Sequence, residues 1–248
     1  MLSIGIIPAR FNSSRFPGKP LAQIHGKSMI RRVYEQASKA KALSAVLVAT
    51  DDQRIFDEVE SFGGRAVMTS PDHGSGTERC LEAVENLGEE YDVIVNIQGD
   101  EPYIKPEQID LILSCFHNEN TEIATLIKLI EEQQVLNDPN KVKVVVDDDD
   151  FGIYFSRQCI PFLQGVPQDQ WNQEFNFYKH IGMYAYRYAT LKEICALKPS
   201  RLERAESLEQ LRWIENGYSI RTAITDDEAI SVDTPQDLEK LNQMKLED

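Results

Sequence analysis

The chain has 248 residues, a formal charge of −15 and a sequence pI near 4.7. Hydrophobic residues make up 42% and charged residues 27%, which is enough apolar material for a well-developed core. So acidic a chain is not suited to neutralising the phosphates of nucleic acids, and we expect no nucleic-acid partner. An anionic ligand would therefore need local cations or a metal ion.

The cysteines and the amino terminus bear on the cellular compartment. Cys80, Cys115, Cys159 and Cys195 are widely spaced, which argues against a zinc site or a disulfide framework and favours a reduced, cytoplasmic protein. The apolar run at the amino terminus ends at Pro8 and has no basic segment before it. We therefore expect neither a signal peptide nor a membrane span.

Strand and helix patterns alternate in the first half of the chain. Strands are expected at Ile4–Ile7, Ala45–Ala49 and Val93–Ile97, and helices at Ser28–Ala40, Asp52–Phe62 and Pro106–Phe116. The alternation predicts an α/β fold with a mostly parallel central sheet and helices on both faces. Ligands of such sheets bind at the carboxyl ends of the strands.

After about residue 120 the pattern becomes β-rich. Strands are expected at Glu122–Ile130, Lys141–Val146, Gly152–Ser156 and Ile181–Tyr188, and helices return at Ser207–Glu215 and Pro235–Met244. No linker composition separates this part, so we predict a single domain over residues 1–248 with a β-rich extension at about 122–190. The four aspartates at 147–150 are expected to form a solvated turn, because their spacing does not fit a calcium loop.

A cationic loop, residues 10–19, follows the first strand and contains Arg10, Arg15 and Lys19. It has neither the glycine spacing of a Walker A loop nor that of a dinucleotide-binding turn. Arginine binds phosphate with a planar fork, lysine offers a point charge, and Gly18 lets backbone amides approach an anion. The loop thus indicates a polyphosphate site, the alternative being a solvated basic turn.

Two carboxylates are candidate metal ligands. Asp100 follows the strand that ends near Gln98, and Asp233 precedes a helix that Thr234 caps with Pro235 in its first turn. Carboxylates near cationic loops suit a Mg²⁺ ion that also binds substrate phosphates. A simple turn aspartate is the alternative for Asp100.

Two further segments have both a structural and a functional interpretation. Ser75-Gly76-Thr77 is typical of a helix start, where free backbone amides can bind an anion or a base edge, although helix capping alone explains the hydroxyls. His180 and Tyr184 lie on one strand and could either be structural or line a polyol pocket.

Seven motifs, in order along nearly the whole chain, closely resemble those of the 3-deoxy-manno-octulosonate (Kdo) cytidylyltransferase family. They are Pro8-Ala9-Arg10 with Ser14-Arg15 and Pro17-Gly18-Lys19, Ser75 to Arg79, Gln98 to Pro102, Tyr154 to Arg157, His180 to Gly182, Leu208 to Arg212, and Val232 to Pro235. The resemblance implies a nucleotide-diphospho-sugar transferase-like fold and a Mg²⁺-dependent reaction of CTP with Kdo that gives CMP-Kdo and pyrophosphate. It also implies a cytoplasmic homodimer that serves lipopolysaccharide synthesis, its dimer surface in the extension.

The resemblance also implies roles for individual residues. Arg10, Arg15, Lys19 and Asp100 would be catalytic, and Asp100 and Asp233 would bind magnesium. The nucleotide would contact Pro8, Ala9, Arg10, Lys19, Ser75, Gly76 and Thr77. The sugar acid would contact Gln98, Arg157, His180, Tyr184, Glu209 and Gln210, with Arg157 near its carboxylate.

The same motifs are compatible with other functions. A cytidylyltransferase for 8-amino-Kdo or sialic acid would share the nucleotide half of the site, because one or two pocket residues can decide the sugar. A non-catalytic nucleotide-binding protein on the same fold is the alternative from another class.

Overall fold

A computed structural model describes residues 1–12 and 15–244. The chain forms two compact units, one of Met1–Asp110 with the segment that starts at Ala229, and one of Leu111–Glu228. The predicted extension lies in the second unit. The boundary between the units falls inside helix α4, Pro106–Ser114.

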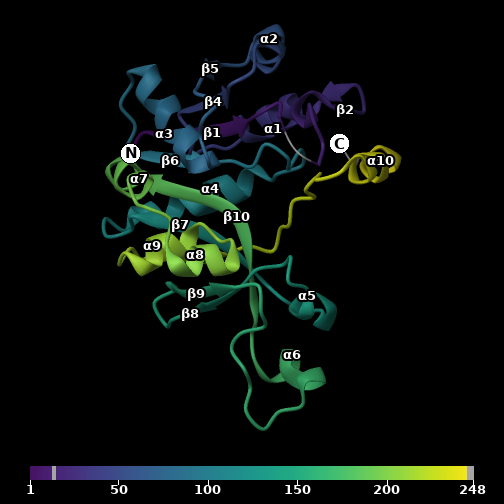
Figure 1. Ribbon diagram of the computed structural model, residues 1–248, viewed down its shortest axis with the longest axis vertical. Helices are drawn as coiled ribbons and strands as arrows, with labels where there is room; N and C mark the ends of the chain where they lie inside the picture. Colours follow the sequence, from purple (N-terminus) through teal and green to yellow (C-terminus); the bar gives the residue numbers. More distant parts are fainter. Residues whose placement is uncertain (13–14, 245–248) are drawn as a thin grey trace. The chain divides into compact units, whose positions relative to one another are not determined.

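The first unit is built on a parallel sheet with the strand order β6-β1-β4-β5 (Figure 1). Its strands are β1 (Ser3–Ala9), β4 (Ala45–Thr50), β5 (Ala66–Met68) and β6 (Val93–Asn96). Its other elements are η1 (Lys19–Leu21), β2 (Gln23–Ile24), β3 (Lys27–Ser28), α1 (Met29–Ala37), α2 (Gln53–Ser61), α3 (Gly76–Leu87) and α10 (Pro235–Gln243). The predicted mostly parallel α/β fold is confirmed here.

The connections of this sheet create a switch point beside β1. The chain moves from β1 through α1 to β4 and through α2 to β5, then returns through α3 to β6 on the other side of β1. Right-handed crossovers therefore place α3 on the sheet face opposite to α1 and α2. Ile4, Ile6 and Ile7 of β1 are fully buried, as expected for a strand covered on both faces. The carboxyl ends of β1 and β6 thus border the crevice where such sheets bind ligands.

The second unit contains a mixed sheet in which β11 pairs parallel with β7, β7 antiparallel with β10, and β8 antiparallel with both β10 and β9. The strands are β7 (Ile123–Leu129), β8 (Lys143–Val146), β9 (Gly152–Ser156), β10 (Tyr178–Arg187) and β11 (Ile220–Ile224). The helices are η2 (Cys115–His117), α5 (Gln133–Asn137), η3 (Gln168–Gln170), α6 (Trp171–Glu174), α7 (Tyr188–Cys195), α8 (Arg201–Glu206) and α9 (Gln210–Glu215). Trp213 of α9 packs edge-on against Tyr184 and Tyr186 of β10.

Several predicted boundaries were wrong. The helix expected at Ser207–Glu215 begins only at Gln210, because Ser207 takes a left-handed conformation that ends α8. The strand expected at Ile181–Tyr188 starts at Tyr178 and ends at Arg187, where α7 begins. The turn expected at the four aspartates is confirmed between β8 and β9.

Candidate active site

The carboxyl ends of β1 and β6 meet closely in the first unit. Gly99, just after β6, leaves no room for a side chain, since a Cβ atom there would lie 2.9 Å from the carbonyl oxygen of Pro8. The adjoining residues Ala9 and Asp100 are thereby held at the same edge of the sheet. The sequence predicted this edge as the ligand site.

The cationic loop folds back toward this edge through Gly18. Gly18 has a left-handed φ of 72° and donates a hydrogen bond from its amide to the carbonyl of Phe11 at 2.8 Å. The turn starts η1 at Lys19 and directs its side chain toward the end of β6. Ser13 and Ser14 lie outside the described residues.

Lys19 joins the two predicted metal carboxylates. Its ammonium lies 2.8 Å from Oδ2 of Asp100 and 3.6 Å from Oδ1 of Asp233, and Arg15 donates to the same Asp233 oxygen at 3.0 Å. The backbone adds a link, because the amide of Val232 donates to the carbonyl of Asp100 at 2.9 Å. Residues far apart in sequence therefore form one cluster of two carboxylates and two cations.

The cap of α10 leaves the Asp233 side chain available to this cluster. Thr234 accepts from the amide of Asp237 at 3.2 Å, and Asp237 accepts from the amide of Thr234 at 2.9 Å. The predicted capping role of Thr234 is confirmed, and Asp237 completes a capping box. Asp233 is thus free to face Arg15 and Lys19.

Arg10, the third cation predicted for the loop, directly follows β1, and its side chain is exposed.

Ser75-Gly76-Thr77 begins α3 beside the end of β1. The Ser75 hydroxyl accepts from the amide of Glu78 at 3.3 Å, which confirms the capping interpretation. A Cβ on Gly76 would lie 3.4 Å from Cγ of Pro8, so the helix start packs on the strand end. Arg79, in the same motif, is buried and donates to Thr69 at 2.6 Å and Asp51 at 3.1 Å.

Of the six predicted sugar-binding residues, Gln98 lies in the first unit and the other five in the second. In the second unit Tyr184 and His180 have ring centres 5.1 Å apart on β10, and Tyr184 also contacts Trp213 of the helix that Gln210 begins. The hydroxyl of Tyr184 and the side-chain amide nitrogen of Gln210 are buried without a hydrogen-bond partner among the described residues. Two such atoms suit a polar ligand, because unpaired buried polar groups are costly.

His180 is neutral in this setting. Burial lowers the pKa of His180 to about 3. Its Nε2 lies 2.9 Å from the hydroxyl of Thr125, which donates to the carbonyl of Met183 at 2.7 Å. Since that hydroxyl has one proton, Nε2–H of His180 donates to it, and Nδ1 carries the lone pair of an acceptor.

Arg157 and Tyr184 have distinct electrostatic surroundings. Arg157 donates to the carbonyls of Glu206, Pro139 and Ser207, at 2.7, 3.2 and 3.4 Å, so most of its fork is held by backbone. Burial, together with the nearby charge of Glu209, raises the pKa of Tyr184 well above its ordinary value. Tyr184 is therefore a neutral hydrogen-bond donor.

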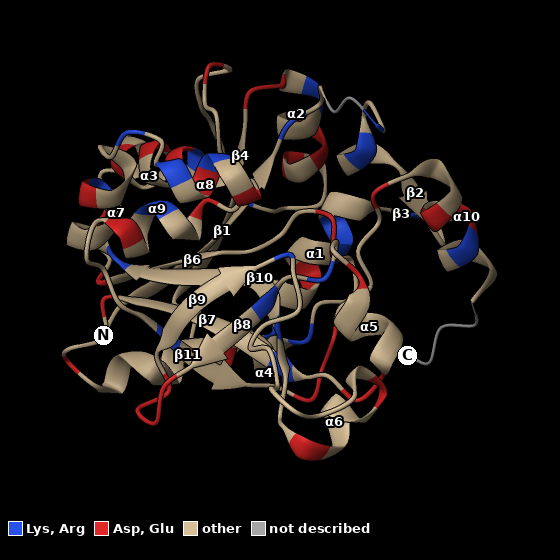
Figure 2. Cartoon of the chain, turned by 60° about the horizontal axis from the view of Figure 1, so that its bottom comes forward, with Lys and Arg blue, Asp and Glu red and all other residues tan. Residues whose placement is uncertain are grey.

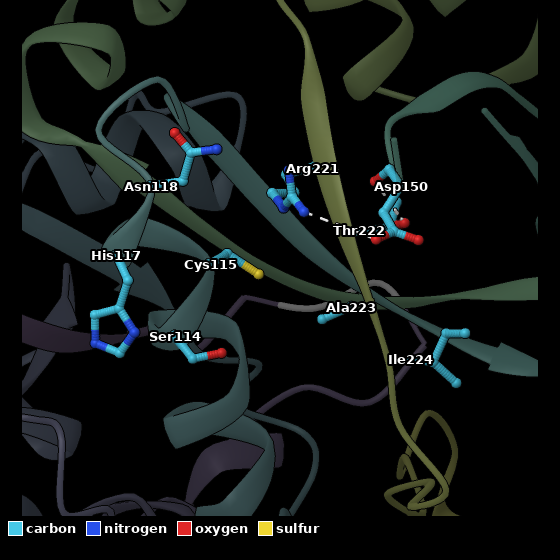
Figure 3. A pocket seen from close by; sticks show the side chains of 9 residues that line it. All are labelled: Ser114, Cys115, His117, Asn118, Asp150, Arg221, Thr222, Ala223 and Ile224. Carbon is cyan, nitrogen blue, oxygen red and sulfur yellow. Dashed lines mark hydrogen bonds and ion pairs between the residues drawn. The ribbon is translucent and has the colours of Figure 1, made fainter. Parts of the chain in front are cut away.

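A separate pocket of about 450 Å³ lies in the second unit between η2 and β11 (Figure 3). Its lining includes Cys115 and Arg221, whose guanidinium lies 3.7 Å from the carboxylate of Asp150. None of its lining residues is a predicted site residue. The pocket therefore gives no support to the predicted chemistry.

Charge elsewhere on the chain is mixed. Acidic side chains are spread over helices such as α2, α3 and α10, with Lys and Arg between them (Figure 2).

None of the helices in the two described ranges has the length and apolar character that a bilayer span requires. In the same ranges no three His, Cys, Asp or Glu side chains gather as a metal site, so Asp100 and Asp233 stand as a carboxylate pair.

The sequence missed Thr125, which contacts the predicted site residue His180, and the contacts of Glu82 and Asn86 with the segment that leads into α3. Thr125 sits inside β7, where a threonine is ordinary, and no pattern marked it. Glu82 and Asn86 continue the four-residue spacing from Glu78 along α3, and that spacing was visible in the sequence.

The chain is similar to known cytidylyltransferases. The model of the cytidylyltransferase family matches residues 4–224, and the chain belongs to this family of nucleotidyltransferases. The resemblance to the Kdo cytidylyltransferases is also confirmed. A 3-deoxy-manno-octulosonate cytidylyltransferase of Parabacteroides distasonis is 56% identical over 244 residues, with 97% of this chain and 96% of that protein covered.

One further relative and two solved structures are also similar to this chain. An 8-amino-3,8-dideoxy-manno-octulosonate cytidylyltransferase of Shewanella sp. strain ANA-3 is 48% identical, with 96% of each chain covered. A solved structure of CMP:2-keto-3-deoxy-manno-octonic acid synthetase complexed with CTP has a TM-score of 0.91 at 41% identity and covers 98% of this chain and 97% of its own. A putative glucose-1-phosphate thymidylyltransferase of Bacillus anthracis, at 17% identity and a TM-score of 0.65, shares the fold.

Proposed function

We propose that this protein transfers CMP from CTP to the anomeric hydroxyl of Kdo and releases pyrophosphate, as a step of lipopolysaccharide synthesis. The observation that carries the proposal is the cluster of Asp100, Asp233, Lys19 and Arg15 at the carboxyl edge of the parallel sheet. The names of the relatives and the CTP-complexed structure support the same reaction.

We propose that Asp100 and Asp233 bind Mg²⁺. The two carboxylates already share one cation, because an oxygen of each lies within 4 Å of the Lys19 ammonium. A pair of carboxylates suits Mg²⁺, which keeps several waters and takes other ligands from substrate phosphates. When bound, the ion would supply positive charge to the phosphates at the reacting centre.

The chain's own residues would contribute positioning and charge. Arg10, Arg15 and Lys19 would bind the triphosphate and offset the charge that develops on the leaving pyrophosphate. Pro8, Ala9 and the start of α3 at Ser75–Thr77 would border the nucleotide. Because no covalent intermediate with the protein is needed, holding the sugar hydroxyl in line with the α-phosphorus is the main requirement.

For the sugar acid we propose the six residues that the sequence indicated. The unpartnered polar atoms of Tyr184 and Gln210 and the acceptor Nδ1 of His180 support a polyhydroxylated ligand in the second unit. Glu209 lies close enough to Tyr184 to raise its pKa and would accept from sugar hydroxyls. Arg157 retains donors beyond its three carbonyl partners and would bind the carboxylate, and Gln98 would complete the set.

A test is product identification by mass spectrometry after incubation of CTP and Mg²⁺ with Kdo, 8-amino-Kdo or sialic acid. We expect CMP-Kdo as the main product. Main product from 8-amino-Kdo would favour the activity named for the Shewanella relatives. CTP binding without turnover on any sugar acid would favour a non-catalytic protein.

The metal assignment has its own test. Asp100→Asn removes a carboxylate of the proposed magnesium pair, and we expect turnover to be abolished. Asp57→Asn, an exposed position on α2, is the matched control and should retain wild-type turnover. Near-normal turnover of the Asp100 variant would contradict the assignment.

We also propose a cytoplasmic homodimer. In the second unit, Phe162 is 74% exposed and packs on the buried Trp171, and Phe175 is 41% exposed and packs on the buried Phe177. A second copy of the chain would cover these exposed rings. The four cysteines are free thiols, which suits a reducing compartment. Sedimentation equilibrium of the wild type and Phe162→Ser tests the dimer, since a monomeric wild type would contradict it.

A further inference from the structure

The loop of residues 69–75 leads from β5 into the start of α3. Its last residue, Ser75, caps α3, and Gly76 packs against Pro8 at the end of β1. A displacement of this loop would therefore move one wall of the proposed nucleotide site. What holds the loop in place thus bears on nucleotide binding.

Three side chains of α3 reach back to this loop or to the end of β5 that precedes it. Glu78 accepts from the amide of Gly74 at 2.7 Å, and Asn86 donates to the carbonyl of Met68 at 3.2 Å. Between them, Glu82 accepts from the amide of Ser70 with both oxygens, at 2.9 and 3.1 Å. These three residues, the α3 stripe, are spaced four apart and so lie on one face of the helix.

Glu82 is the centre of the α3 stripe. Besides the Ser70 amide, its carboxylate contacts Nε2 of His73 and accepts from Asn86 at 3.4 Å. Burial alone would raise the pKa of Glu82, but the bonds from Ser70, His73 and Asn86 outweigh it and lower the pKa. The residue is therefore ionised, and hydrogen bonds to an ionised acceptor are the strong kind.

We propose that Glu82 is a positioning residue for the nucleotide, which fixes the loop of residues 69–75 on α3 so that Ser75–Thr77 meets CTP in a preformed geometry. This inference rests on the proposed function. Its contacts are all with the loop and with its own helix, so Glu82 acts through the loop. A loop ordered in advance lowers the entropy that binding must overcome.

The test compares Glu82→Gln with Glu85→Gln, an exposed glutamate on the same helix. The glutamine keeps one oxygen for Ser70 but loses the charge and the second acceptor. We expect Glu82→Gln to raise the KM for CTP about tenfold, with kcat and the KM for the sugar acid within about twofold of wild type. Glu85→Gln should leave all three constants unchanged.

Hydrogen exchange tests the inference without catalysis. In Glu82→Gln we expect faster exchange of amides 70–74 in the free protein and recovery of protection when CTP is added. Unchanged exchange, or faster exchange with an unchanged CTP affinity by calorimetry, would overturn the positioning role. Failure of the proposed function would instead appear as a wild type that does not turn over Kdo. In that case calorimetry of CTP binding to the wild type and to Glu82→Gln still tests the positioning role.

Discussion

Lys19 contacts both carboxylates that would hold the proposed metal ion. Its ammonium lies 2.8 Å from Asp100 and 3.6 Å from Asp233, and its side chain is only 16% exposed. A divalent cation that binds the same carboxylates must compete with this ammonium. Lys19→Met should therefore lower turnover, because the triphosphate loses a cation, and yet raise the affinity for a metal ion added without nucleotide.

The magnitude follows from the charges. Opposite charges about 4 Å apart attract by about 1 kcal/mol in water and about 4 kcal/mol at an effective dielectric constant of 20. Asp100 and Asp233 are 28% and 40% exposed, so solvent screens much of this attraction. We expect a gain of about 1–2 kcal/mol in metal binding, which corresponds to roughly five- to thirtyfold in affinity.

The assay is a titration with Mn²⁺ in the absence of CTP, followed by electron paramagnetic resonance of the free ion. Lys41→Met, an exposed lysine of the first unit, controls for the change in net charge. If Lys19→Met binds the metal ion no more tightly than the wild type, the proposed competition between the Lys19 ammonium and the metal ion is refuted.

Three further predictions use contacts described above. Gly99→Ala should lower turnover at least tenfold, because its Cβ would push against the carbonyl of Pro8 at the proposed site. Steady-state kinetics measure this loss, and circular dichroism should show that the secondary structure is retained. Tyr184→Phe should raise the KM for the sugar acid yet stabilise the fold by about 1 kcal/mol, since it removes a buried hydroxyl without a partner among the described residues; urea unfolding measures the gain, and a loss would contradict it. Because burial lowers the pKa of His180 to about 3, below the unfolded value of about 6.5, protonation favours the unfolded chain. The stability that neutral His180 allows is present above pH 6.5 and is lost as the pH falls toward 3, so between pH 7 and 5 the wild type should lose about 2 kcal/mol more than His180→Asn.

Local patterns predicted much of the first unit. Runs such as Ile4–Ile7 are apolar without alternation, which marks strands buried on both faces, and amphipathic spacing marked α1 and α2. β5, with three residues, is too short for such a pattern. α8 was missed although Ser200 and Glu203 form a capping box that the sequence displays.

In the candidate site, too, features set by near neighbours in the sequence could be predicted, and features set by strand pairing could not. Helix capping by Ser75 and Thr234 depends on neighbours within three residues, so the sequence was sufficient for both. The contacts of Thr125 with β10 depend on how β7 and β10 pair, where the register shifts between Ile181 and Tyr184. A pairing irregularity of this kind has no local signal.

By itself, the sequence determined the chemical groups available to the site: a cationic loop after one strand, a carboxylate after another and a carboxylate before a capped helix. Each follows from residue type and near neighbours. Only the tertiary structure decided which of these groups meet, bringing Lys19 to Asp100 across 81 positions and Arg15 to Asp233 across 218. The physical reason is that β1 and β6 end at one edge of the parallel sheet, which brings Lys19 to Asp100, and that the hydrogen bond from the amide of Val232 to the carbonyl of Asp100 brings Asp233 to the same edge.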